Sequence, residues 1–186
     1  RPGEIMFGLN MVIAKGKTIF VGDTSVNEYP SSEELAEIAI SSARVVKLFG
    51  FVPKVAFVSH STFGQPLTNR TKHIKRAVEI LKNKDVDFDF DGDMQPDVAL
   101  NVEYKELYPF SSIVGNANIL IMPGQHSAAI SYKMMKSLGN TKVIGPLLIG
   151  LGQPIEIAPL RSSTSEIINL ASVAAYSADV IDYKKN

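Results

Sequence analysis

A loop rich in hydroxyl side chains is the first segment of this chain that could do chemistry. Residues 59–64, Ser-His-Ser-Thr-Phe-Gly, directly follow a short apolar run. Small hydroxyl residues beside a glycine allow several backbone N–H groups to converge on an anion. From the sequence the loop is first interpreted as a solvated turn between strand and helix, and a site for phosphate or for the phosphorylated tail of a cofactor is the functional alternative. His60 offers a base, but the spacing assembles no Ser-His-acid arrangement around it.

An acidic cluster between Asp87 and Asp97 raises the question of a metal site. The segment from Asp87 to Gly92 matches the start of an EF-hand calcium loop. The last ligand position of such a loop should be a bidentate glutamate, and here it is Val98. The histidines are scattered and lack metal-ligand spacing; they stand at positions 60, 73 and 126. We therefore expect no metal site in these residues.

Charge and composition argue against several classes of function. Lys+Arg and Asp+Glu number 19 each, so no net field favours nucleic acid or an anionic membrane as a partner. The absence of cysteine removes thiol nucleophiles and disulfides. The Gly-x-Gly-x-x-Gly fingerprint and the P-loop are both missing, so a nicotinamide or nucleoside triphosphate site is not indicated. No apolar run has membrane-spanning length and no signal peptide opens the chain, which predicts a cytoplasmic protein.

Short apolar strands that alternate with amphipathic helices must position these groups. Strands are expected at residues 5–14, 18–21, 55–58, 87–91, 119–122 and 143–149. Residues 15–17, Lys-Gly-Lys, are a turn signal that can join the first two strands as a hairpin, and the strand at 87–91 is expected to end at the Asp91-Gly92 turn. Helices are expected from the capping box of Ser31 and Glu34 to Gly50, around 74–81, at 94–101, through Ile130, Met134 and Leu138, and from a second capping box at Ser163 and Glu166 onwards. The Met134-Met135 pair is most simply interpreted as part of the core. The alternation predicts an α/β fold with a largely parallel sheet, and ligands bind such sheets at the carboxyl ends of strands. Here these are the loops after Val58, Phe90 and Met122.

Several motifs, in this order, resemble the phosphotransacetylase (phosphate acetyl/butyryl transferase) family. Residues 21–27, Val-Gly-Asp-Thr-Ser-Val-Asn, are similar to that family's Phe-Ala-Asp-Thr-Ala-Val-Asn segment. The loop 59–64 resembles its Ser-Phe-Ser-Thr-x-Gly loop, and residues 91–100 resemble Asp-Gly-Glu-Leu-Gln-x-Asp-Ala-Ala-Leu. Residues 116–123 and 145–151 complete a resemblance that covers essentially the whole chain.

The resemblance implies a fold and a division of the chain. The expected fold is a three-layer α/β sandwich with a largely parallel sheet, of the isocitrate/isopropylmalate dehydrogenase-like superfold. Residues 1–135 are then expected to form the family's second α/β domain, and residues 136–186 its C-terminal return to a first domain that is mostly absent. Because the chain opens at Arg1 in strand-like sequence, we expect a fragment of a longer protein.

The chain departs from the family where the chemistry should be. Family members carry Asn-Asp-Leu-Ser-Arg-Gly after the proline that corresponds to Pro154. Counting from there places Pro159 at the catalytic serine, Leu160 at the arginine and Glu166 at the catalytic aspartate. Acyl transfer needs a base for the CoA thiol and cationic donors for the acyl phosphate, and neither proline nor leucine supplies them. Arg161 stands one residue too late. Residues 123–128 also differ from the family, where an aspartate and a Gly-Asn pair are usual.

The degenerate site resembles the version of this domain found at the C terminus of large bacterial NADP-dependent malic enzymes. In that subgroup the domain is a non-catalytic module for oligomerisation and for regulation by acetyl-CoA. The resemblance implies a parent enzyme that converts malate to pyruvate and CO2 with NADP and Mg or Mn, with that chemistry outside these residues. It also implies no cofactor of the fragment's own, acetyl-CoA as an effector, and a homo-oligomer of at least two copies.

Five residues on strand-end loops that match the family are the candidate ligand-binding residues: Ser61, Thr62, Asp91, Gln95 and Arg161. Two alternatives to the regulatory module stay open. One is an active phosphate acyltransferase that uses Arg161 and Glu166 to move an acyl group between CoA and phosphate. The other is a structural dimerisation domain without any ligand. The missing N-terminal part of the same chain is expected as a partner in each case.

Overall fold

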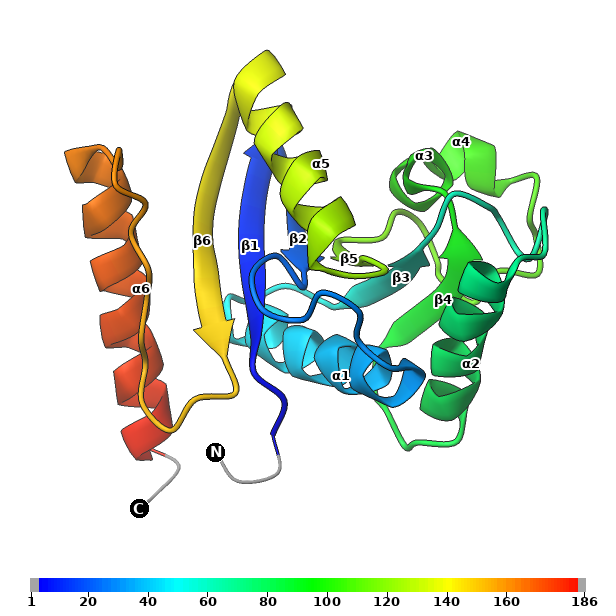
Figure 1. The fold of residues 1–186 in the computed structure, drawn as a ribbon, viewed down its shortest axis with the longest axis horizontal. Helices are drawn as coiled ribbons and strands as arrows, with labels where there is room; N and C mark the ends of the chain where they lie inside the picture. The colour runs from blue at the N-terminus through cyan, green and yellow to red at the C-terminus, as the bar shows by residue number, and fades with distance from the viewer. Residues whose placement is uncertain (1–3, 184–186) are drawn as a thin grey trace.

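A six-stranded sheet runs through the molecule in the computed structural model, which describes residues 4–183 apart from the side chains of residues 105 and 179–183. The strands are β1 Phe7–Ala14, β2 Lys17–Gly22, β3 Lys54–Val58, β4 Asp89–Met94, β5 Ile119–Ile121 and β6 Thr141–Ile149, and their order in the sheet is β4-β3-β5-β2-β1-β6 (Figure 1). Only β1 runs against its neighbours, so the expected largely parallel sheet is confirmed.

A hairpin joins β1 to β2, as the turn signal at residues 15–17 predicts. Lys15 and Gly16 both have positive φ angles, 49° and 73°, which is the geometry of a two-residue turn with the twist of its flanking strands. β1 then lies between β2 and β6 and is buried on both faces. That double burial explains why its sequence is a continuous apolar run and does not alternate.

Helices cover both faces of the sheet and complete three layers. One face packs on α1 (Ser32–Leu48), α2 (Asn69–Lys82) and α6 (Thr164–Tyr183), in a core that includes Phe20, Phe57 and Leu147. The other face packs on α3 (Pro96–Leu100) and α5 (Gln125–Leu138), around Met94 and Leu120. A single turn, α4 (Val102–Lys105), follows α3. The expected α/β sandwich is confirmed, and both predicted capping boxes are present.

The acidic strand β4 differs from its prediction. It does not end in a turn at Asp91-Gly92 but continues through Gly92 to Met94. Gly92 makes this passage possible because its φ is 151° and a Cβ there would lie 2.6 Å from the carbonyl oxygen of Phe57. The carboxylates of Asp91 and Asp89 accept the backbone N–H groups of residues 112 and 114, at 2.7 Å and 3.4 Å. The alternating acids thus hold a loop segment against β4.

Helix α5 forms where its apolar spacing predicts it, but with a different face toward the core. The exposed fractions of Ile130, Met134 and Leu138 are 53%, 53% and 83%. The side that packs on the sheet carries Ala128, which is fully buried, and the partly buried Tyr132 and Met135. The interpretation of Met134 as a core residue is therefore wrong, because Met134 lies on the side of α5 that faces away from the sheet.

The last helix rests lightly on the rest of the molecule. Leu170 is its one buried side chain within the residues whose burial is described. The hydroxyl of Tyr176 donates to the carbonyl of Leu48 at 2.9 Å, and its ring stacks on Phe49 with centroids 6.3 Å apart.

Because β6 pairs with β1 along nearly its whole length, residues 141–149 belong to the same sheet as the first strands. The division of the chain at residue 135 stays a prediction. Over residues 4–183, no helix combines the length and the apolar character needed to cross a bilayer.

Candidate functional site

Five strands end at the same edge of the sheet. β2, β3, β4 and β5 are parallel, and β6 points the same way because both β2 and β6 are antiparallel to β1. The loops after these strands are therefore the places where a ligand site is expected. One of these loops differs in position from its prediction: β4 continues beyond Phe90, so the loop after it begins at Gln95.

The hydroxyl-rich loop after β3 is organised by Asp93, a residue that the sequence did not single out. This aspartate is 1% exposed. One carboxylate oxygen accepts the hydroxyl of Ser61, and the other accepts the backbone N–H of Gly64 at 3.1 Å. The backbone carbonyl of Asp93 accepts the N–H of Phe63 at 2.7 Å. Groups that could have converged on a phosphate thus converge on an internal carboxylate, which is the arrangement of a structural turn.

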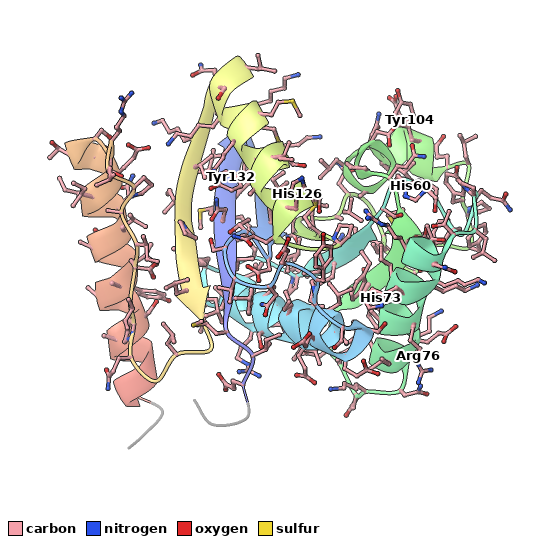
Figure 2. All side chains as sticks on the ribbon, viewed as in Figure 1. His60, His73, Arg76, Tyr104, His126 and Tyr132 are labelled. Atoms are coloured by element: carbon pink, nitrogen blue, oxygen red, sulfur yellow. The ribbon has the colours of Figure 1, made fainter. Side chains whose placement is uncertain are left out.

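Three of the five candidate ligand-binding residues come together in this loop. The Thr62 hydroxyl accepts the backbone N–H of Gln95 at 3.2 Å, next to the Ser61–Asp93 pair. The Gln95 side chain donates to the carbonyl of His60 at 3.1 Å, and the imidazole of His60 is exposed at the surface near α3 and α4 (Figure 2).

The other two candidates lie elsewhere. The Asp91 carboxylate accepts the N–H groups of Gly92 and Ser112, so it is occupied by the loop that packs on β4. Arg161 precedes α6, which packs on β6, whereas β3 and β4 form the opposite end of the sheet order. Figure 1 shows α6 separated from the β3 loop by β6, β1 and α5. The structure therefore does not bring Arg161 to Ser61, Thr62 or Gln95, and ligand binding by these residues stays a prediction.

A second buried aspartate shapes the loop after β2. Asp23 is completely buried, and one of its oxygens accepts N–H groups from Gly8, Ser25 and Val26 at 2.8–3.1 Å. The other oxygen accepts the backbone and side-chain N–H groups of Asn27 at 2.6 Å and 2.7 Å. These five donors saturate the Asp23 carboxylate, so the role of Asp23 here is to fix the conformation of the loop after β2.

A cavity of about 200 Å³ lies between α5, β6 and α6, and two of the three degenerate positions line it. They are Pro159 and Glu166; Leu160 is fully exposed at 107% and is not part of the wall. The polar part of the wall comes from α5, from the segment before α6 and from α6 itself: Tyr132, Lys133, Lys136, Ser162 and Asn169. Residues 143–146 of β6 and Leu170 supply the apolar part.

Glu166 is held as an ionised carboxylate by structural hydrogen bonds, which makes it unsuited to proton transfer. Its Oε1 accepts the Lys136 ammonium at 2.7 Å, while Oε2 accepts the backbone N–H and the hydroxyl of Ser163 at 2.8 Å and 2.9 Å. The hydrogen bond from Lys136, followed by those from Ser163, lowers the pKa of Glu166 to about 2. A carboxylate with so low a pKa is a weak base at neutral pH.

Ser162 is the polar group of this wall that the sequence missed. Its hydroxyl is buried and has no hydrogen-bond partner, although it lines the cavity beside Pro159 and Glu166. Together with the ammonium groups of Lys133 and Lys136 it can offer hydrogen bonds to an anionic or carbonyl group. No local pattern marks Lys133 and Lys136 as site residues, because they reach this wall only through the packing of α5 on β6. Within the described part of the chain, no group of three or more His, Asp or Glu side chains could hold a metal ion.

Comparison with protein families matches residues 1–175 to the family described as phosphate acetyl/butaryl transferase. The chain is 46% identical over 178 residues to the NADP-dependent malic enzyme of Rhizobium meliloti (strain 1021), which covers 96% of this chain and 23% of that protein. It is 36% identical over 170 residues to the phosphate acetyltransferase of Bacillus subtilis (strain 168), covering 90% of this chain and 52% of that one. The chain thus spans only part of the length of these relatives.

Among solved structures, a phosphotransacetylase from Streptococcus pyogenes superposes with a TM-score of 0.89 at 32% sequence identity. The match covers 96% of this chain and 55% of that one. The phosphotransacetylase-like fold expected from the motifs is therefore confirmed.

Proposed function

The chain belongs to the phosphate acetyl/butaryl transferase family, and we propose that it is the regulatory and oligomer-forming module of a larger NADP-dependent malic enzyme, inactive in acyl transfer and responsive to acetyl-CoA. The observation that carries the proposal is the wall of the cavity between α5, β6 and α6. Proline stands where the family has its catalytic serine, and the remaining carboxylate is committed to Lys136 and Ser163.

Loss of transfer follows from what the reaction requires. The CoA thiol must give up a proton, and the acyl group must be stabilised by cations and hydrogen-bond donors as it passes to phosphate. Pro159 has no hydroxyl, and Glu166 is a poor proton acceptor with its pKa near 2. The cavity keeps two ammonium groups and the Ser162 hydroxyl, which suit binding of a thioester or its phosphates more than turnover.

Similarity to malic enzymes supports the choice of parent protein. In the Rhizobium relative the matched part is 23% of the whole, which leaves room for catalytic domains outside it. The conversion of malate to pyruvate and CO2, with NADP and Mg or Mn, is then performed by those other parts. An effector bound in the cavity would change catalysis through a coupling free energy of about 1–3 kcal/mol, with acetyl-CoA and malate affecting each other's binding equally.

Two measurements on the full-length protein test the proposal. An assay of acetyl phosphate formation from acetyl-CoA and phosphate should give no turnover, and robust turnover would end the claim of inactivity. Titration calorimetry should show heat on adding acetyl-CoA. Absence of heat would replace the regulatory proposal by a purely structural dimerisation module. Sedimentation of the same sample should show at least a dimer.

Two lysines provide a matched pair of variants for the calorimetry. Lys133→Met removes an ammonium from the cavity wall, whereas Lys75→Met removes one from the exposed surface of α2. A hydrogen bond to a charged group is worth about 1.5–3 kcal/mol, so Lys133→Met should weaken acetyl-CoA binding at least about tenfold. Lys75→Met should bind as the parent protein does. Equal affinities for both variants would place the effector elsewhere.

An active phosphate acyltransferase is the second candidate, and Ser162 is the observation that favours it. Its unpartnered hydroxyl lies in the cavity wall three residues after the position of the lost serine. The candidate would use this hydroxyl with Arg161 and Glu166. Acetyl phosphate formation that Ser162→Ala abolishes would establish it and displace the regulatory proposal.

A further inference from the structure

We propose that Glu156 is a proton-operated latch that holds residues 150–163 against the sheet and so controls the wall of the candidate cavity. This segment links β6 to α6 and carries Pro159 and Ser162, both part of that wall. The latch rests on the proposed function in one respect, since it supplies a regulation of the same site.

Glu156 attaches the middle of this segment to the edge strand β6. Glu156 forms an isolated β-bridge with Leu147 of β6, and most of its neighbours in the linker are exposed. Leu148, the residue after this bridge partner, lies close enough for its backbone N–H to act on the Glu156 carboxyl. The second carboxyl oxygen, Oε2, is buried without a hydrogen-bond partner. Only a protonated carboxyl rests there without leaving an uncompensated charge.

A second cavity lies beside Glu156 and offers space into which its side chain can move when the linker is released. It has a volume of about 130 Å³ and lies between α1, β6 and α6. Its walls are largely apolar, with Val45, Leu48, Phe49, Val173 and Tyr176 facing β6. An apolar environment disfavours the ionised form of a carboxyl group.

The charged groups around the second cavity do not compensate Glu156. The N-terminal segment contributes Glu4 and α1 contributes Arg44, and these two pair with each other at 3.5 Å. The residues that line the cavity from β6 and from α6 carry no charge. Burial therefore dominates, and it raises the pKa of Glu156 to about 7, against a smaller opposing effect of the Leu148 hydrogen bond.

The direction of the switch follows from proton linkage. Glu156 has a pKa of about 7 when docked and an ordinary value near 4.5 when the linker is released. The docked state binds more protons, so docking is strongest below about pH 4.5 and weakens as the pH rises through 7. Between pH 6 and pH 8 these two values give a fall of about tenfold in the docking equilibrium.

Hydrogen exchange on the full-length protein measures this equilibrium at the Leu148 amide, which directly follows the bridge between Leu147 and Glu156. Each rate is divided by the rate of an unstructured peptide at the same pH. Protection at Leu148 should fall about tenfold from pH 6 to pH 8. Glu156→Gln keeps the shape and an acceptor oxygen but cannot ionise, so its protection should not change with pH. Glu103→Gln, at an exposed position of α4, should behave like the parent protein.

Two outcomes of the exchange experiment would overturn the latch. One is protection that does not change with pH in the parent protein, and the other is a pH dependence that persists unaltered in Glu156→Gln. The carboxyl 13C titration of Glu156 tests the latch in the unmutated chain: a midpoint near 7 supports it, and one below about 5 overturns it. Neither experiment contains CoA. Failure of the latch is therefore distinguishable from failure of the effector proposal, which calorimetry decides.

Discussion

The ammonium of Lys136 lies 2.7 Å from Oε1 of Glu166 and thereby joins α5 to α6 across the cavity that Pro159 lines. The same carboxylate starts α6 through Ser163. Both oxygens of the Glu166 carboxylate thus have structural partners, and these partners lower its pKa.

Removing the lysine should restore an ordinary carboxyl group. We expect Lys136→Met to raise the pKa of Glu166 from about 2 toward 4.5, because the largest cause of the lowered value is lost. Carboxyl 13C titration measures this directly. Lys133→Met, in the same cavity wall, should leave the midpoint where it is. Since the pKa is lowered in the folded state, the pair's contribution to stability is present above about pH 4.5 and is lost as the pH falls toward 2.

Replacing Asp23 by asparagine should destabilise the fold. Asparagine keeps one acceptor oxygen and places an N–H₂ group among five donors, so buried N–H groups of the β2 loop lose their acceptor. The expected loss in the free energy of unfolding is about 3 kcal/mol, measured by urea denaturation. Asp85→Asn, at an exposed position, should change stability by less than about 0.5 kcal/mol. Equal stability of the two variants would contradict the structural role of Asp23.

Gly92→Ala should be far more damaging than Gly152→Ala. An alanine Cβ at position 92 would meet the Phe57 carbonyl oxygen at 2.6 Å, in a backbone conformation with φ of 151°. At position 152 a Cβ has no neighbour within 4 Å. We expect a loss of about 3 kcal/mol at position 92 and of less than about 1 kcal/mol at position 152, by thermal or urea unfolding.

The two acids at either end of the Asp87–Asp91 segment should respond differently to alanine. Asp91→Ala removes the acceptor of the Ser112 N–H, and hydrogen exchange at that amide should accelerate by at least about tenfold. Asp87 makes an exposed ion pair with Lys47, so Asp87→Ala should leave the stability close to that of the parent protein. A slow Ser112 amide in Asp91→Ala would show that other contacts hold the 112–114 segment.

The elements whose determinants are local can be predicted from the sequence. The hairpin at Lys15-Gly16 and the helix that Ser31 caps depend on residues only a few positions apart, so their patterns are complete in the sequence. The continuation of β4 through Gly92 could not be predicted locally, because this glycine is required by the close approach of the Phe57 carbonyl on the neighbouring strand. The exposed face of α5 was mispredicted because apolar spacing defines a helix without saying which side meets the sheet.

The candidate site could be predicted only in part for the same reason. The family resemblance directs attention to residues 159–166 because its motif is continuous there, and Pro159 and Glu166 do line a cavity. Asp93 organises Ser61 across 32 positions of sequence, and Lys136 reaches Glu166 across 30. Such contacts exist only after the strands are ordered. Arg161 was grouped with Ser61 because both belong to strand-end loops, but opposite ends of the sheet separate them.

The double engagement of Glu166 limits what a substitution at this position can do. Its carboxylate closes the capping box of α6 and also pairs with Lys136, so any replacement removes a helix cap and an ion pair together. In the alignment that underlies the proposal, a serine at 159 and an arginine at 160 would therefore stand beside a carboxylate whose two oxygens are already bound.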